Sequence, residues 1–223
     1  MMDKTIVLYT TYYTEKTQER QTELLECIKN NTSTSIDKIY LLVEKDDNID
    51  KTDPIFGSKK LEIVIVDSRV TFKYMFEFIN KTIANNSQVS VVTNSDIYLD
   101  EDGINKLKTY NLENIALALS RWDVLEDKSI RFNRCPNWSQ DCWIFSGPVK
   151  TVNYADFFFG IPGCDNRIAC ELMFAGYIVL NVGTHLKTYH LHADETRDWS
   201  KLKTIRPPYF LVKVTPDDSI LLV

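Results

Sequence analysis

The segment from Val89 to Asp100 constrains the fold of this chain more than any other. Its first part, Val89–Thr93, is mostly β-branched or apolar, and the small polar and acidic residues of Asn94–Asp96 follow at once. A short apolar run of this kind is typical of a buried parallel strand. In open α/β sheets, ligands bind in the crevice beyond the carboxyl ends of such strands. The pattern predicts that Asp96 lies at the edge of a binding crevice; the alternative is an ordinary polar turn.

Strand-like and helix-like segments alternate along the first half of the chain. The expected strands are Thr5–Tyr13, Ile36–Glu44, Leu61–Asp67, Val89–Thr93 and Ile115–Leu119, and the expected helices are Glu15–Asn30, Thr71–Ala84 and Ile104–Thr109. Such an alternation predicts an α/β fold with a doubly wound, mainly parallel sheet flanked by helices. We find no glycine-rich GxGxxG segment or P-loop in it, which disfavours a dinucleotide-binding dehydrogenase and a P-loop NTPase.

The second half of the chain is less regular. Residues 123–136 are charged and irregular, which predicts a surface excursion, and residues 155–163 form an apolar loop broken by glycine and proline. The remaining expected elements are strands at Asp141–Phe145, Tyr177–Val182, Leu186–His192 and Tyr209–Val214, and a helix at Asp165–Ala175. No change of composition divides the chain, so we predict one domain over all 223 residues.

Composition excludes several classes of protein. The formal net charge is −5 and no basic run occurs, which disfavours a nucleic-acid partner. No apolar stretch reaches the roughly 18–20 residues that span a bilayer, and Met1–Tyr9 lacks the features of a signal peptide. The five cysteines are odd in number and lack paired spacing, which favours free thiols in a reducing compartment. We therefore expect a cytoplasmic protein without a transmembrane segment.

Four side chains are candidates for chemistry on the residues alone. A carboxylate at a strand end, such as Asp96, suits a divalent cation that bridges phosphate oxygens. His190 and His192 are two residues apart on an expected strand, so both side chains face the same way; the alternative is a core or surface histidine. Asp165 begins an expected helix, where the helix dipole favours a carboxylate whether or not it has a function.

Three stretches, taken in order, resemble the GT-A-fold glycosyltransferases. Thr93–Tyr98 resembles their degenerate DxD segment, Gly163–Leu172 resembles the acidic motif of their acceptor-side helix, and Thr188–Arg197 resembles their late histidine-containing strand. The likeness covers nearly the whole chain and is closest to small domains encoded by large DNA viruses and some bacteria. The chain departs from the pattern at Asn94, where the family has an aspartate, and this removes one possible metal or ribose ligand.

The resemblance implies a single GT-A-like domain in which residues 1–121 bind a nucleoside diphosphate sugar, with a UDP-sugar favoured, and residues 122–223 face the acceptor. The donor-binding residues it implies are Thr10, Tyr12, Glu44, Arg69, Lys73, Asn94, Ser95 and Arg121. For Arg69 and Lys73 the alternative is a solvated surface position, and Arg121 could face the acceptor instead of the donor. The aromatic side chains of Trp138, Trp143 and Phe157–Phe159 form either an acceptor platform or part of the core.

The same resemblance assigns the chemistry. Asp96, with one of His190 and His192, would hold Mn²⁺ or Mg²⁺ on the donor diphosphate. Asp165 would act as the general base that takes a proton from a hydroxyl of a glycan or protein acceptor, in an inverting reaction. For a viral protein, the expected location is the host cytoplasm.

Two other functions remain open. Asp100–Gly103 imitates the DxDG motif of haloacid-dehalogenase-like phosphatases, with Asp100 as nucleophile, although three α/β units precede it here. The second alternative is a nucleotide-sugar or glycan-binding module without turnover, which Asn94 keeps open.

Overall fold

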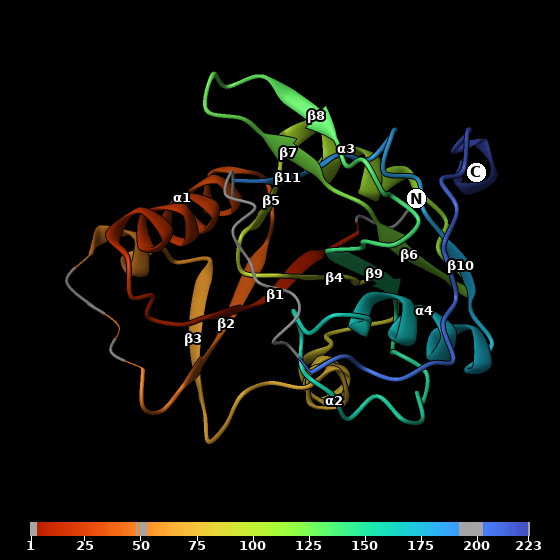
Figure 1. Ribbon diagram of the computed structural model, residues 1–223, viewed down its shortest axis with the longest axis horizontal. Coiled ribbons are helices and arrows are strands. Elements are labelled where there is room, and N and C mark those ends of the chain that lie inside the picture. The colour runs from red at the N-terminus through yellow and green to blue at the C-terminus, as the bar shows by residue number, and fades with distance from the viewer. Residues whose placement is uncertain (1–3, 48, 50–52, 192–202, 223) are drawn as a thin grey trace.

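A seven-stranded sheet forms the centre of the computed structural model, which describes residues 4–47, 49, 53–191 and 203–222 (Figure 1). The strand order is β10-β6-β9-β4-β1-β2-β3. The bounds are Ile6–Tyr12 for β1, Lys38–Glu44 for β2, Leu61–Val66 for β3, Val89–Thr93 for β4, Ile115–Leu119 for β6, Cys142–Ser146 for β9 and Ile178–Leu180 for β10. Neighbouring strands are parallel except at β9, which runs antiparallel to both β4 and β6.

A second, four-stranded sheet lies beyond β4. Its strands are β5 (Ile97–Leu99), β11 (Thr188–His190), β7 (Trp122–Val124) and β8 (Ile130–Phe132), in that spatial order. β11 is antiparallel to β5 and parallel to β7. The chain passes from β4 to β5 through residues 94–96, so the two sheets meet at Asp96.

Helices cover both faces of the large sheet. They are α1 (Gln18–Ser33), α2 (Phe72–Thr82), α3 (Glu101–Thr109) and α4 (Cys164–Phe174), and short 3₁₀ turns occur at Pro54–Gly57 and Ser219–Leu221. Figure 1 shows α1 and α3 above the sheet and α2 and α4 below it. Alternation along the strands explains this arrangement: in β1, Ile6 and Leu8 pack in the cluster that contains α3, whereas Val7 and Tyr9 pack in the cluster that contains α2 and α4.

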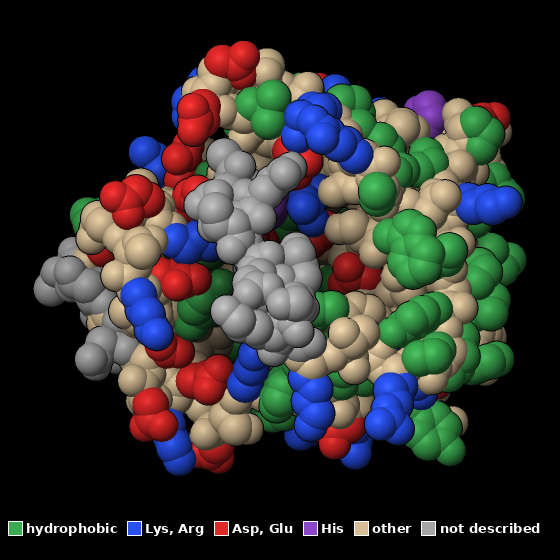
Figure 2. All heavy atoms as spheres, in the orientation of Figure 1, with side chains coloured by type: hydrophobic (Ala, Val, Ile, Leu, Met, Phe, Trp, Pro, Cys, Tyr) green, Lys and Arg blue, Asp and Glu red, His purple; other side chains and the backbone are tan. Residues whose placement is uncertain are grey.

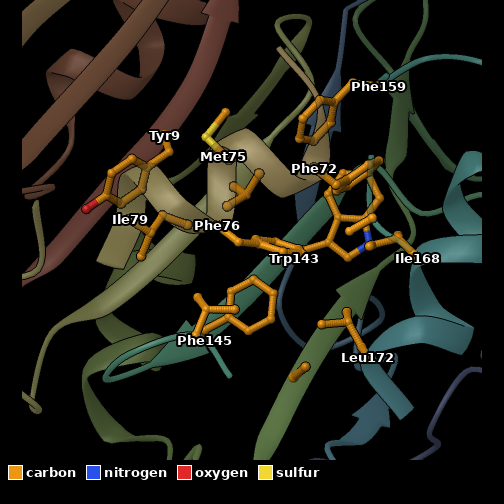
Figure 3. Packing of buried hydrophobic residues seen from close by; sticks show 14 of the residues in the cluster. Tyr9, Phe72, Met75, Phe76, Ile79, Trp143, Phe145, Phe159, Ile168 and Leu172 are labelled. Carbon is orange, nitrogen blue, oxygen red and sulfur yellow. The ribbon is translucent and has the colours of Figure 1, made fainter. Parts of the chain in front are cut away.

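Aromatic side chains fill the space between the sheet, α2 and α4 (Figure 3). Trp143 of β9 is fully buried, and its ring meets Phe72 of α2 edge to face, with centroids 4.9 Å apart. Phe145, also on β9, meets Phe76 in the same way at 5.4 Å. Edge-to-face contacts of this kind add to the free energy gained by burying the rings. β9 therefore packs against α2, in the same core cluster as Ile168 and Leu172 of α4.

The expected α/β fold with a mainly parallel sheet is confirmed, but three local predictions need correction. The region 123–136 is not an irregular excursion, because it carries the antiparallel pair β7 and β8. Tyr209–Val214 is not a strand; Val214 makes only an isolated bridge to Asn181. Strand β5 was not expected, because three residues are too few to show a period.

The surface divides by side-chain type. Figure 2 shows charged side chains around α1 and β3 and apolar side chains gathered over α4 and β10. Exposed apolar residues in the second region include Met173, Phe174 and Ile178. The cysteines are free thiols, as expected, and Cys135 alone among them is exposed. Within the described part of the chain, no helix has the length and apolar character needed to cross a bilayer.

The position of Trp143 leads to a stability prediction. We expect Trp143→Ala to lower the free energy of unfolding by about 3–5 kcal/mol, because the substitution leaves a large cavity between β9 and α2. Urea denaturation followed by circular dichroism measures the change. Trp138, which is 57% exposed, provides the matched control: Trp138→Ala should change the free energy by no more than about 0.5 kcal/mol. Equal losses in both variants would contradict this description of the core.

Candidate active site

Asp96 is a buried carboxylate at the junction of the two sheets, with only 7% of the residue exposed. Its Oδ2 atom accepts hydrogen bonds from Nη2 of Arg20 at 2.5 Å and from Nε2 of His190 at 3.2 Å. Burial by itself raises the pKa of the Asp96 carboxyl, but His190 and Arg20 outweigh burial and hold that pKa well below its usual range. Asp96 is therefore a fixed negative charge at the expected edge of the sheet.

Helix α1 brings Arg20 to this carboxylate. At the far end of the helix, the side chain of Asn31 donates to the carbonyl of Ile97 and accepts from the amide of Leu99, both at 3.0 Å, and so attaches α1 to β5. At the near end, Arg20 lies in the first turn and also binds Glu23 at 2.7 Å. A cation in the first turn opposes the helix dipole at a cost of about 0.3–1 kcal/mol. The acidic side chains around Arg20 offset this cost.

His190 lies between two carboxylates. Its Nε2 atom faces Asp96, and its Nδ1 atom is 3.3 Å from Oδ1 of Asp123 at the middle of β7. Burial lowers the pKa of the His190 imidazole, whereas Asp96 and Asp123 raise it, and the net shift is upward. The hydrogen bonds with His190 and Arg121 overcome the effect of burial on Asp123 and lower its pKa to about 2. Negative charge on both sides thus favours a protonated His190.

Arg121 extends the network to the large sheet. Its guanidinium binds Asp123 through Nε and Asp141 through Nη1, both at 2.8 Å. Asp141 immediately precedes β9, and its Oδ1 atom accepts a hydrogen bond from Nδ2 of Asn94 at 2.9 Å. Because β9 is antiparallel to β4, its beginning lies at the carboxyl end of β4. A second carboxylate therefore stands beside Asn94 although the loop after β4 contributes only Asp96.

Asp165 stands at the start of α4, next to the same network. Gly163 precedes the helix with φ +83°, and a Cβ atom there would lie 2.8 Å from the hydroxyl of Tyr209, so the turn requires glycine. Burial and repulsion from Asp141 raise the pKa of Asp165 to about 7, although Cys164 donates a hydrogen bond to its Oδ1 atom at 3.1 Å. A carboxyl group with this pKa can accept and release a proton near neutral pH.

The atoms that could hold a metal ion are Oδ2 of Asp96 and, once Nε2 has lost its proton, Nε2 of His190. One carboxylate oxygen and one imidazole nitrogen suit Mn²⁺, and Mg²⁺ is commonly held by one or two carboxylates together with substrate phosphates and water. No group of three or more potential ligands from His, Cys, Asp and Glu occurs among the residues that the structure describes. The other expected ligand, His192, lies outside those residues. The pair fits a cation that takes its remaining ligands from a bound diphosphate.

The other expected donor-binding residues occupy the carboxyl ends of β1, β2 and β4. The hydroxyl of Thr10 donates to the carbonyl of Thr93 at 3.1 Å, which ties β1 to β4. Tyr12 is buried, and its hydroxyl accepts a hydrogen bond from Gln21 at 2.6 Å. Glu44 ends β2, and Ser95 lies between Asn94 and Asp96; both are partly buried. Their positions agree with a ligand at this edge, and their roles stay predictions.

Arg69 and Lys73 lie farther away, beyond the edge strand β3. β3 is separated from β4 by β2 and β1 in the sheet, and both basic side chains are exposed. They line a polar cavity of about 460 Å³ together with Asp67 and Asp156. Arg69 donates to the carbonyl of Phe159 at 2.7 Å, so it braces the loop that leads to α4. The structure does not bring them into the network around Asp96.

The structure disfavours two further expectations, the place of Trp143 in an acceptor platform and the role of Asp100 as a nucleophile. Trp143 cannot belong to an acceptor platform, because it is fully buried in the core and Phe159 packs beside it. Asp100, the nucleophile of the phosphatase alternative, caps helix α3: one oxygen accepts from the amide of Gly103 at 2.8 Å and the other from the hydroxyl of Tyr189 at 2.7 Å. The DxDG pattern at residues 100–103 is explained by this helix cap.

Three residues of the network were not predicted from the sequence: Arg20, Asp123 and Asp141. The sequence contained one indication that Arg20 has an acidic partner, because a basic residue in the first turn of a helix is unfavourable without one. Asp141 was the first residue of a predicted strand, but only an antiparallel orientation of that strand places it at the edge where β4 ends. Asp123 carried no signal, since its segment was expected to be irregular.

The contact between Asn94 and Asp141 can be tested by exchanging the two side chains. Asn94→Asp places two carboxylates at a 2.9 Å contact, and we expect it to lower the free energy of unfolding by about 1–3 kcal/mol. Adding Asp141→Asn restores an amide–carboxylate pair, with the charge now at position 94. Urea denaturation of both single variants and the double variant should give a favourable coupling of about 0.5–3 kcal/mol. Additive effects would show that the two side chains do not interact.

The raised pKa of Asp165 predicts how stability changes with pH. The folded state releases this proton at about pH 7 and the unfolded state at about pH 4, so stability falls as pH rises between these values. Asp165→Asn removes the effect, and its unfolding free energy relative to wild type should increase by roughly 2–4 kcal/mol from pH 4 to pH 8. Asp102→Asn, in the first turn of α3, is the exposed control and should show no such increase.

No protein-family model and no curated protein matches the sequence. Among solved structures, the crystal structure of GalNAc-T7 with UDP, GalNAc and Mn²⁺ aligns with a TM-score of 0.56 and 9% identity, over 95% of this chain and 46% of that one. Residues 1–349 of S. aureus TarS in complex with UDP-GlcNAc align with a TM-score of 0.53 and 10% identity, over 88% of this chain and 61% of that one.

At identities this low, structural similarity establishes a shared fold and does not establish a function. The chain spans about half of the GalNAc-T7 chain and 61% of the chain of TarS residues 1–349, so both contain additional structure. The more specific resemblance to domains of large DNA viruses stays a prediction. What the comparisons and the observed sheet establish together is a GT-A-like fold, a single α/β domain with a mainly parallel central sheet flanked by helices.

Proposed function

We propose that this protein is a glycosyltransferase. It transfers a sugar from a nucleoside diphosphate sugar, with UDP favoured as the nucleotide, to a hydroxyl group of a glycan or protein. Asp165 is the catalytic base, and Asp96 with His190 anchors the donor diphosphate through a divalent cation. The observation that carries the proposal is the presence of two carboxylates with opposite pKa shifts at the edge where β4 ends.

The opposite shifts suit two different roles. Asp96 remains ionised next to Arg20 and His190, as an anchor for a cation must. Asp165, with a pKa of about 7, is a better proton acceptor than an ordinary aspartate and is still ionised in a large fraction of molecules at neutral pH. Pairs of titratable groups whose surroundings drive their pKa values apart mark acid–base sites in many enzymes.

The proposed reaction is a single displacement with inversion. Asp165 accepts the proton of the acceptor hydroxyl while the acceptor oxygen forms a bond to the anomeric carbon of the donor sugar. The bond between that carbon and the diphosphate oxygen breaks, and the nucleoside diphosphate leaves with the electron pair. Protons and charge balance, because the negative charge lost at Asp165 appears on the leaving diphosphate.

The remaining residues position the substrates. Asp96 and His190 would hold Mn²⁺ or Mg²⁺, which supplies Lewis-acid stabilisation of the departing diphosphate when it is bound. Thr10, Tyr12 and Glu44 lie at the ends of β1 and β2, where a nucleoside would meet hydroxyl and ring contacts. The two solved structures of similar fold contain UDP with GalNAc and Mn²⁺ or UDP-GlcNAc, which supports a UDP-sugar donor here.

Donor binding and catalysis are tested in separate steps. We expect one class among UDP-, GDP-, CMP- and dTDP-sugars to raise the melting temperature in the presence of Mn²⁺ but not with EDTA. At a ligand concentration one hundred times the dissociation constant, the stabilisation is about 2.7 kcal/mol. Asp96→Ala should abolish the shift. Asp165→Asn should retain it and lose at least about a hundredfold in donor hydrolysis or transfer.

The outcomes distinguish the enzyme from a binding module. A metal-dependent shift together with slow donor hydrolysis that Asp165→Asn abolishes supports a transferase. Tight donor binding without turnover in the wild-type protein would identify a nucleotide-sugar-binding module instead. The absence of a shift with every donor would refute both functions.

A further inference from the structure

We propose that Arg20 is the resident counter-ion of Asp96 and that it limits the affinity of the site for divalent cations. This inference rests on the metal requirement of the proposed function. In the form described above, the guanidinium occupies the same carboxylate oxygen that a bound cation would use. Metal binding and the Arg20–Asp96 ion pair therefore compete.

The geometry supports direct competition. Nη2 of Arg20 lies 2.5 Å from Oδ2 of Asp96, and Nε2 of His190 lies 3.2 Å from the same atom. The side chains of Arg20 and Asp96 are only 9% and 10% exposed, so water screens the pair weakly. A cation bound to both Oδ2 and Nε2 cannot enter while the guanidinium keeps this hydrogen bond.

The charges around Arg20 show where it can go when a cation enters. Glu23 binds Nη1 at 2.7 Å, and Glu15 lies 3.8 Å from Nε. Glu15 and Glu23 are partly exposed, so they can keep the guanidinium paired at the surface after it leaves Asp96. Arg20 thus alternates between one buried carboxylate and two more exposed ones, and it stays charged in both positions.

This arrangement makes the site selective for a cation that arrives with a diphosphate. A free divalent cation must displace a positive guanidinium and the Nε2 proton of His190, and it gains one carboxylate and one imidazole. A cation bound to a nucleoside diphosphate carries less net charge and brings phosphate oxygens, which can themselves pair with the released guanidinium. We therefore expect the protein to bind Mn²⁺ alone weakly.

The experiment measures binding of Mn²⁺ alone, without donor or acceptor, from the electron paramagnetic resonance signal of free Mn²⁺. Arg20→Met removes the charge but keeps most of the side-chain volume. We expect this variant to bind Mn²⁺ at least about tenfold more tightly than wild type, because the guanidinium no longer repels the cation or competes with it for Asp96. Mn²⁺ should also raise the melting temperature of Arg20→Met more than that of wild type, since it replaces the lost counter-charge.

Two further variants keep the test decisive. Arg167→Met is the matched control: Arg167 is also largely buried and pairs with Glu171 at 2.7 Å on α4, and its removal should leave Mn²⁺ affinity unchanged. Arg20→Gln retains a hydrogen-bond donor without the charge, and it serves if Arg20→Met does not fold. Equal or weaker Mn²⁺ binding by the Arg20 variants overturns the inference. Because no donor is present, this result is separate from the donor-binding and turnover assays that test the transferase itself.

Discussion

The buried negative charge of Asp96 is the constraint on which the rest of the site depends. An isolated carboxylate removed from water is unstable, so its surroundings must supply positive charge or a proton. Here the positive charge comes from Arg20 on α1 and from His190 on β11, which both bind its Oδ2 atom. The fold meets this requirement because Asn31 attaches α1 to β5 and because β11 pairs with β5 in the small sheet.

The same reasoning extends along the network to the second carboxylate. His190, which binds Asp96, also binds Asp123, and Asp123 helps to raise the pKa of the imidazole. Arg121 in turn pairs with Asp123 and with Asp141. At the end of this series Asp165 forms no ion pair with any residue that the structure describes, and burial and Asp141 raise its pKa. The network therefore produces an anchored anion at one end and a proton acceptor at the other.

Much of the fold could be predicted from the sequence because its pattern is local. The apolar run Val89–Thr93 and the alternation of strands and helices follow from side-chain periodicity, which depends only on neighbouring residues. Asp96 could be placed at a strand end for the same reason. The short strands β5, β7 and β8 could not be predicted, because three residues do not establish a period and their pairing comes from distant segments.

Asn94 shows most clearly which features the sequence determines and which depend on the tertiary structure. By itself the sequence determined that the loop after β4 offers one carboxylate, Asp96, where the GT-A resemblance leads one to expect two. Only the tertiary structure placed Asp141 beside Asn94, because strand direction follows from hydrogen bonding between strands and not from the order of residues. The sequence thus determined which side chains stand at strand and helix ends. Tertiary packing decided which of them meet, which charges they balance and which one accepts a proton near neutral pH.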